Sequence, residues 1–185
     1  MNRYPIAVAG LERSLPICPV NETLSIGAFV IFGDAPLTQA RAAALLEKAP
    51  DYDYLLTAEA KGIPLAHEMA RQRGDAHYFV ARKKAKFYMT EVFHVSVRSI
   101  TTQGEQSLYL DAADARLMQG KRILLVDDVV STGESLAAIE ELARRAGGLV
   151  CGKMAILAEG DAQRRQDVVY LEKLPLFNPD GTIKE

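Results

Sequence analysis

Residues 123–135 read ILLVDDVVSTGES, and this stretch decides the fold class of the chain. Its first four residues form an unbroken apolar run, which is typical of a strand at the centre of a parallel sheet. Asp127 and Asp128 follow directly, and a Ser/Thr/Gly turn then opens a helix that is predicted from about Gly133 to Ala146. A buried strand that leads through a short turn into a helix predicts an α/β protein.

The remainder of the chain repeats this alternation of strand and helix. Further strands are predicted at 52–58, 77–81, 149–157 and 168–171, and further helices at 36–49 and 62–73. The expected fold is therefore α/β, with a mostly parallel central sheet flanked by helices. Sheets of this kind bind ligands at the carboxyl ends of their strands, so we expect chemistry just after Ala58, Ala81 and Val126.

Two segments depart from the alternation. Apolar residues occupy alternate positions from 87 to 97, which predicts an antiparallel strand, with 107–111 as its partner across a turn at 102–104. Near the N-terminus, strand-like stretches at Ile6–Ala9 and Ile26–Phe32 are separated by two prolines. We therefore expect an antiparallel hairpin in addition to the main sheet.

Composition limits the functional classes. The 185 residues include 22 Lys and Arg against 24 Asp and Glu, and the net charge of −2 argues against a nucleic-acid or membrane-surface role. No apolar run approaches the length of a membrane span, and the first residues lack a signal-peptide pattern. Cys18 and Cys151 lie far apart in apolar settings and are interpreted as reduced thiols. These features predict a single cytoplasmic domain over residues 1–185, either an enzyme or a binding protein.

The segment from Asp127 to Ser135 predicts a site for a phosphorylated sugar. Backbone amides at a helix N-terminus attract an anion, and Ser131, Thr132 and Ser135 add hydroxyl donors. This loop lacks the GxxxxGK pattern of triphosphate-binding loops. Asp127 and Asp128 can accept hydrogen bonds from sugar hydroxyls and can help to hold a hydrated Mg²⁺. A phosphate cradle beside two carboxylates describes a ribose 5-phosphate.

Two cationic segments accompany this site. Residues 59–62 read EAKG and fall where a strand turns into a helix, and the glycine there lets backbone amides approach a diphosphate closely. Residues 82–86 place four cations in five positions directly after the next strand. Each segment is also compatible with an ordinary turn or a solvated surface, so the two patterns alone leave both interpretations open.

Together these segments resemble the type I phosphoribosyltransferases, and the adenine phosphoribosyltransferase-like proteins in particular. Residues 123–135 are similar to the phosphoribosyl pyrophosphate signature of the family. EAKG resembles its Glu-Ala-Arg-Gly pyrophosphate loop, with Lys61 in place of the Arg, which keeps the charge and loses the bidentate fork. Residues 82–86 resemble the Arg-Lys-x-x-Lys stretch that leads into the family's catalytic loop. The resemblance covers a core at 36–160, and it implies that residues 1–35 form a small N-terminal hood for base recognition.

The resemblance implies an enzyme of purine salvage that transfers ribose 5-phosphate from phosphoribosyl pyrophosphate to a purine base and releases pyrophosphate. It implies a homodimer and a flexible hairpin, from about 84 to 106, that closes over the site. It also implies Mg²⁺ as cofactor, bound by Asp127 and Asp128 mainly through water and substrate. The implied catalytic residues are Asp127, Asp128, Lys61 and Arg82. The implied 5-phosphate ligands are Ser131, Thr132, Gly133, Glu134 and Ser135. The implied pyrophosphate ligands are Ala60, Lys61, Gly62, Arg82, Lys83 and Lys86.

Base recognition departs from the family pattern. Adenine-type enzymes carry a loop Glu at the position where this chain has Thr102, and hypoxanthine-guanine-type enzymes place an acid where Ser131 stands. Glu105 is a nearby substitute. Three interpretations stay open: an adenine enzyme, which leads; an enzyme for xanthine, hypoxanthine or guanine; and a non-catalytic sensor of phosphoribosyl pyrophosphate. A receiver domain of the response-regulator type also has paired acids, but it lacks the phosphate loop.

Overall fold

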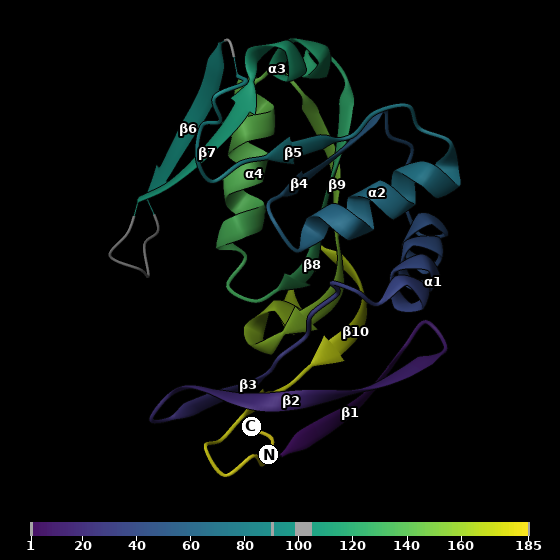
Figure 1. Cartoon of the computed structure of the whole chain (residues 1–185), viewed down its shortest axis with the longest axis vertical. Helices are drawn as coiled ribbons and strands as arrows, with labels where there is room; N and C mark the ends of the chain where they lie inside the picture. The colour runs from purple at the N-terminus through teal and green to yellow at the C-terminus, as the bar shows by residue number, and fades with distance from the viewer. Residues whose placement is uncertain (1, 90, 99–104, 185) are drawn as a thin grey trace.

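The computed structural model describes residues 2–89, 91–98 and 105–184. Its centre is a five-stranded sheet (Figure 1). The strands, in spatial order, are β10 (Val169–Leu174), β9 (Leu149–Glu159), β8 (Arg122–Val130), β4 (Tyr54–Ala58) and β5 (Phe79–Ala81). Each strand pairs in parallel with its neighbour, which confirms the predicted α/β class.

Helices cover both faces of this sheet (Figure 1). They are α1 (Ala35–Leu46) and α2 (Gly62–Arg73) on one side and α4 (Glu134–Arg145) on the other. Successive residues of β8 face opposite cores, because Leu124 and Val126 join the cluster of α1 and α2 whereas Ile123 and Leu125 join that of α4. All four are 0% exposed. Burial on both faces is the reason for the unbroken apolar run.

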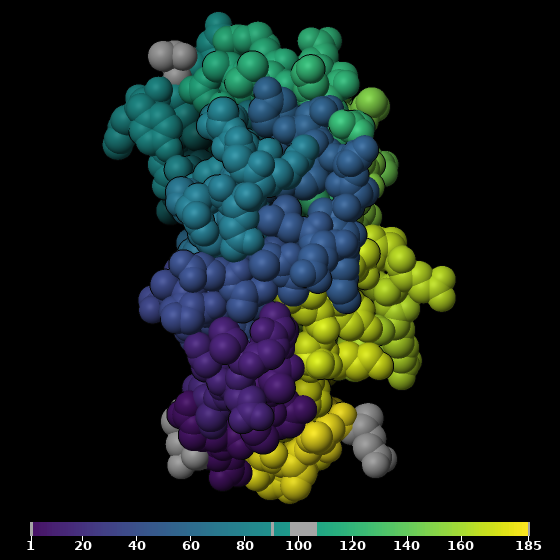
Figure 2. All heavy atoms as spheres, turned by 90° about the vertical axis from the view of Figure 1, so that its right-hand side faces the viewer, coloured from purple at the N-terminus to yellow at the C-terminus, as the bar shows by residue number. Residues whose placement is uncertain are grey.

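A second, antiparallel sheet lies at one end of the molecule (Figure 1). It consists of β1 (Arg3–Val8), β2 (Leu11–Asn21), β3 (Leu24–Gly27) and β11 (Leu176–Phe177). The last strand comes from the far end of the chain and pairs with β3. Figure 2 shows the first and last segments of the chain packed against each other at this end.

Two expectations for the N-terminal region are wrong. Strand β2 runs through both prolines, because the Pro16 carbonyl still accepts a hydrogen bond from the Ala28 amide at 2.9 Å and the pairing with β3 shifts register near Pro19. The apolar run at Ile26–Phe32 stays in the sheet only as far as Gly27. Beyond that point it buries alternate side chains against the core without strand pairing.

The predicted hairpin is present as β6 (Val92–Arg98) and β7 (Glu105–Asp111), paired antiparallel. Phe87 and Met89 precede β6, because the Met89 amide bonds the Lys86 carbonyl in a turn. The expected turn at 102–104 lies outside the described residues. A short helix, α3 (Ala112–Met118), follows β7 and was not expected; Asp111 caps it by accepting the Ala113 amide at 2.9 Å.

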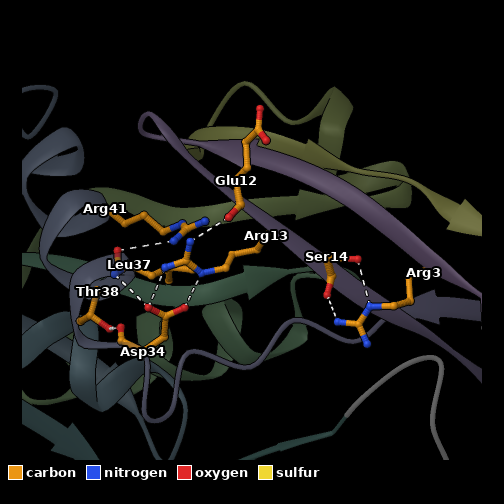
Figure 3. Close-up of polar contacts among 8 residues, drawn as sticks. All are labelled: Arg3, Glu12, Arg13, Ser14, Asp34, Leu37, Thr38 and Arg41. Atoms are coloured by element: carbon orange, nitrogen blue, oxygen red, sulfur yellow. Dashed lines mark hydrogen bonds and ion pairs between the residues drawn. The ribbon is translucent and has the colours of Figure 1, made fainter.

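Asp34 ties the second sheet to α1 (Figure 3). Its carboxylate accepts the Leu37 amide at 3.2 Å as the helix N-cap and two hydrogen bonds from Arg13 of β2, at 2.6 and 2.9 Å. Arg41 of α1 is 0% exposed and lies over the Phe29 ring, 5.5 Å from its centre. Burial, followed by the charge of Arg13, lowers the pKa of Arg41 to about 10, whereas Asp34 acts in the opposite direction. Asp34 therefore offsets two cations at once.

We predict that Asp34→Asn destabilises the protein. Asn retains the N-cap acceptor but loses the charge that faces Arg13 and Arg41, so the free energy of unfolding at pH 7 should fall by roughly 1–3 kcal/mol. The Arg13 hydrogen bond, chiefly, lowers the pKa of Asp34. The advantage of Asp over Asn should therefore be present above pH ~4 and be lost as the pH falls below that value. Denaturant unfolding at pH 7 and pH 3 measures both effects.

The matched control for this variant is Asp161→Asn. The Asp161 side chain is 99% exposed and its nearest cation, Arg164, is 3.9 Å away. Its loss should change the stability by less than ~0.5 kcal/mol. Equal stability of the Asp34 and Asp161 variants at pH 7 would contradict the importance of the Asp34 network.

Candidate phosphoribosyl site

The carboxyl ends of β4, β5 and β8 lie at one edge of the central sheet, because the strands are parallel neighbours. Strands β4 and β5 end at Ala58 and Ala81, as predicted. Strand β8 extends four positions beyond Val126, to Val130. Asp127 and Asp128 therefore lie within the strand instead of after its end. The acids are consequently more buried than a loop position would make them.

The two acids form a buried pair. Asp127 is 7% and Asp128 3% exposed, and the Asp128 amide donates to Asp127 Oδ1 at 2.9 Å. Lys61 Nζ lies 2.9 Å from Asp128 Oδ2. Burial, reinforced by the negative charge of Asp128, raises the pKa of Asp127 to about 7, although a hydrogen bond with Ser135 opposes the shift. The pair thus carries less than two full negative charges near neutral pH.

Gly62 allows the β4–α2 turn to reach this pair. A Cβ at that position would overlap the Thr57 hydroxyl oxygen and would lie 3.4 Å from Asp127 Oδ1. Only a glycine therefore permits the first turn of α2 to pack so closely on β4 and β8. Ala60 precedes it in the same turn and accepts the Ile63 amide at 3.2 Å. The close approach positions Lys61 over Asp128.

Glu59 joins the turn to the cationic segment after β5. Its carboxylate accepts the Lys83 amide at 2.6 Å and lies 3.4 Å from Arg82 Nη1 and 3.9 Å from Lys86 Nζ. Burial alone would raise the pKa of Glu59, but the Lys83 amide and the two cations outweigh it, and the pKa is lowered. Lys83 contributes its amide to this contact, while Arg82 and Lys86 contribute charge.

The phosphate loop lies between β8 and α4. Gly133 has φ 81° and is the N-cap of α4, whose first residue is Glu134. Thr132 Oγ1 accepts the Glu134 amide at 3.4 Å. The Arg165 guanidinium packs against Gly133, where a Cβ would overlap Nη1, so the loop requires glycine both for its backbone and for this contact.

Two residues near the loop were missed by sequence reasoning. Arg165 is held by Asp167 through hydrogen bonds of 3.0 and 2.8 Å, and no local pattern links its position to residue 133. Glu159 ends β9 and is 8% exposed. The rule that parallel sheets bind ligands at their carboxyl edge applies to β9 as well, so Glu159 could have been found by extending the rule to that strand.

The structure brings the three sequence motifs together. Lys61 links the turn after β4 to the acid pair, Ser135 links the phosphate loop to Asp127, and Glu59 links the turn to Arg82. Thr102, at the position of the expected loop acid, lies outside the described residues, and the Glu105 side chain does too. The expected closure of the hairpin over the site also involves residues 90 and 99–104, which are not described.

In the described part of the chain, no three His, Cys, Asp or Glu side chains gather as a metal site. No helix in the same ranges is long and apolar enough to cross a membrane. Cys18 and Cys151 are both free, and each is half-buried.

Comparison with known proteins identifies the family. A model of the phosphoribosyl transferase domain matches residues 32–175. A hypoxanthine/guanine phosphoribosyltransferase of Methanothermococcus okinawensis is 28% identical, over 91% of this chain and 95% of the relative. One of Methanococcus voltae is 33% identical, over 61% of this chain and 56% of the relative. An adenine phosphoribosyltransferase structure from Rhodothermus marinus is similar with a TM-score of 0.66 at 25% identity, over 78% of this chain and 83% of that one.

The family match covers most of the chain, and it includes the acid pair, the phosphate loop and both cationic segments. The fold neighbour has the same architecture as the parallel sheet and helices described above. The chain belongs to the phosphoribosyl transferase domain family.

Proposed function

We propose that this protein transfers ribose 5-phosphate from phosphoribosyl pyrophosphate to a purine base in purine salvage and releases pyrophosphate. The observation that carries the proposal is the convergence of the acid pair, the phosphate loop and the Lys61 turn at one sheet edge, joined by the 2.9 Å contact between Lys61 and Asp128. The names of the relatives, which are purine phosphoribosyltransferases, support the same class of reaction.

Each part of the donor substrate has a complementary partner. The amides and hydroxyls of residues 131–135, at the N-terminus of α4, suit the 5-phosphate. Asp127 and Asp128 suit the sugar hydroxyls, because carboxylates accept two hydrogen bonds each. The backbone at Ala60 and Gly62 and the cations of residues 61 and 82–86 suit the pyrophosphate.

The reaction displaces pyrophosphate from C1 of the ribose by a ring nitrogen of the base. Negative charge grows on the leaving group, so Lys61 and Arg82 would lower the barrier by electrostatic stabilisation. The 5-phosphate contacts at the α4 N-terminus hold the sugar far from the bond that breaks, and this remote binding energy orients C1. Catalysis thus consists of positioning and charge, with no covalent intermediate on the protein.

Mg²⁺ fits the donor set in a limited way. Asp127 and Asp128 offer the hard carboxylate oxygens that this ion prefers, and no third acid, His or Cys gathers with them in the described ranges. These two residues would therefore hold the ion mainly through water and substrate oxygens. When bound, Mg²⁺ supplies countercharge for the departing pyrophosphate. The homodimer and the cytoplasmic location stay predictions.

Adenine and a 6-oxopurine are both candidates for the accepting base. The fold neighbour is an adenine enzyme, whereas the sequence relatives are hypoxanthine/guanine enzymes. We keep adenine as the leading candidate and a 6-oxopurine, which the sequence relatives favour, as the second. A sensor that binds phosphoribosyl pyrophosphate without turnover is the third, and it is favoured by Thr102 at the position of the expected loop Glu.

A panel of bases tests the proposed activity. The protein is incubated with Mg²⁺, phosphoribosyl pyrophosphate and adenine, hypoxanthine, guanine, xanthine, uracil or orotate, and pyrophosphate release is measured. We expect release with at least one purine and none with uracil or orotate. Tight binding of phosphoribosyl pyrophosphate with no turnover of any base would identify the sensor instead.

Replacement of both acids tests the sugar site. Asp127→Asn with Asp128→Asn should abolish binding of phosphoribosyl pyrophosphate by calorimetry, or its turnover, because the hydroxyl acceptors and metal ligands are lost. If binding and turnover both survive, the assignment of these acids is wrong.

The single variant Asp127→Asn tests whether ionisation of Asp127 lowers the stability of the fold. Because the pKa of Asp127 is raised from the ordinary value of ~4 to about 7 in the folded protein, the stability should fall as the pH rises from ~4 to about 7 and should level off above that. The variant should therefore be more stable than the wild type at pH 8, by roughly 1–3 kcal/mol, and equal to it below pH ~4, where the acid is protonated in both states. Thermal unfolding at pH 8 and pH 4 measures this difference, and a variant less stable than the wild type at pH 8 would contradict it.

A further inference from the structure

A cation from a distant segment lies against the phosphate loop. Arg165 belongs to the connection between β9 and β10, and its guanidinium contacts Gly133, the N-cap of α4. A Cβ at Gly133 would overlap Nη1, and it would lie 3.1 Å from Cζ and 3.8 Å from Nη2. The guanidinium therefore meets the loop with Nη1 foremost.

Asp167 holds the opposite edge of this guanidinium. Its two carboxylate oxygens accept hydrogen bonds from Nε at 3.0 Å and from Nη2 at 2.8 Å. A fork of this kind occupies one edge of the planar group and fixes its orientation. It leaves the two hydrogens of Nη1 for another acceptor. The Arg165 side chain is 29% exposed, so the group is not sealed inside the core.

Further ion pairs tie this arrangement to α4. Lys153 of β9 lies 3.0 Å from Asp167 and 2.6 Å from Glu140 of α4. The Lys153 and Glu140 side chains are each only 16% exposed. Arg165 is thus connected, through Asp167 and Lys153, to the same helix whose N-terminus it contacts at Gly133. Its place beside the loop is set by the body of the fold.

The phosphate loop has no cation in its own sequence. Residues 131–135 include one acid, Glu134, and the acids Asp127 and Asp128 precede them. Triphosphate-binding loops of the GxxxxGK type carry a lysine within the motif. A phosphate at the α4 N-terminus would be attracted by the backbone amides, but the nearby carboxylates would repel it. A cation in contact with the loop offsets this repulsion.

We propose that Arg165 is a binding residue for the 5-phosphate and that it donates from Nη1 to a phosphate oxygen while Asp167 holds its other edge. This inference rests on the proposed function, which puts the 5-phosphate at residues 131–135. Arg165 contacts the phosphate and is remote from the bonds that change, so it contributes to the affinity for the phosphorylated sugar. Asp167 is a positioning residue, because it acts through Arg165.

Two probes, each of which fills half of the donor site, test this role. Calorimetry measures the binding of ribose 5-phosphate and of pyrophosphate to the wild type and to Arg165→Gln. The Kd for ribose 5-phosphate should rise by roughly 10–100-fold, the usual loss with a hydrogen bond to a charged group. The Kd for pyrophosphate should change by less than about 3-fold, because Lys61 and Arg82 are untouched. An unchanged Kd for ribose 5-phosphate would overturn the proposal.

Steady-state kinetics give a second measurement of the same variant. In Arg165→Gln the KM for phosphoribosyl pyrophosphate should rise, while kcat with the base that the wild type uses should stay within about 3-fold of the wild-type value. This split is expected of an interaction that is equally strong before and during the chemical step. A fall in kcat at an unchanged KM would contradict a binding role for Arg165.

The neighbouring arginine supplies the matched control. The Arg164 side chain is 88% exposed, and it lies 3.9 Å from Asp161. Arg164→Gln removes the same charge one position away and should leave the Kd for both probes unchanged. An equal loss of ribose 5-phosphate affinity in the two arginine variants would show a general effect of surface charge and would overturn the assignment to Arg165.

Two further variants keep the test decisive if Arg165→Gln fails to fold. Arg165→Lys keeps the charge and loses the fork, so its Kd for ribose 5-phosphate should be at least about 3-fold above that of the wild type and below that of Arg165→Gln. Asp167→Asn releases the guanidinium and should raise the same Kd by roughly 3–10-fold, without effect on pyrophosphate. Wild-type affinity in both variants, or a lysine variant no better than the glutamine variant, refutes the proposal.

The outcomes separate this inference from the proposed function. Turnover by the wild type together with an unchanged ribose 5-phosphate affinity in Arg165→Gln refutes the role of Arg165 and leaves the transfer reaction standing. If the wild type binds phosphoribosyl pyrophosphate without turnover and Arg165→Gln loses ribose 5-phosphate, the transfer reaction fails and the role of Arg165 stands. A wild type that binds neither compound refutes both.

Discussion

The ion pair between Lys61 and Asp128 is the constraint on which the site depends. Burial makes an unpaired carboxylate costly, and Asp128 is paired with Lys61 of the β4–α2 turn. Lys61 can reach it only because Gly62 lets the turn pack on β8. Asp127 stands beside the pair, and burial together with the negative charge of Asp128 raises its pKa. This contact thus joins the β4–α2 turn to the end of β8 and sets much of the charge of the site.

The central part of the fold could be predicted because its sequence signals are local. The apolar run before Asp127 must be buried on both faces. In an α/β sheet, a run of that kind belongs to a central strand, which helices cover on both sides. The acid pair and the Gly133 loop follow it within a few residues, so their proximity is set by the chain itself. The same holds for α2, whose end at Gly74, with φ 82°, is marked by the glycine.

The rest depends on contacts between distant segments. Pro16 lies inside β2, where its carbonyl accepts the Ala28 amide, and no local pattern shows that partner. Glu159 lies beside Ser131 only through the β8–β9 register, and Arg165 reaches Gly133 only through the turn after β9. The hood was predicted to consist of residues 1–35 alone. Its sheet also includes a fourth strand, residues 176–177, from the far end of the chain. Residues that are remote in sequence complete both the site and the second sheet.

The contact between Glu59 and the cations after β5 has a consequence for product inhibition. An anion that binds Arg82 and Lys86 would compete with the Glu59 carboxylate, which already lies 3.4 Å from the first and 3.9 Å from the second. In the proposed site, this competition would lower the affinity for free pyrophosphate. The carboxylate returns to the cations when the anion departs. In the proposed reaction, Glu59 would therefore favour release of pyrophosphate and would weaken occupation of the site by unreactive phosphates.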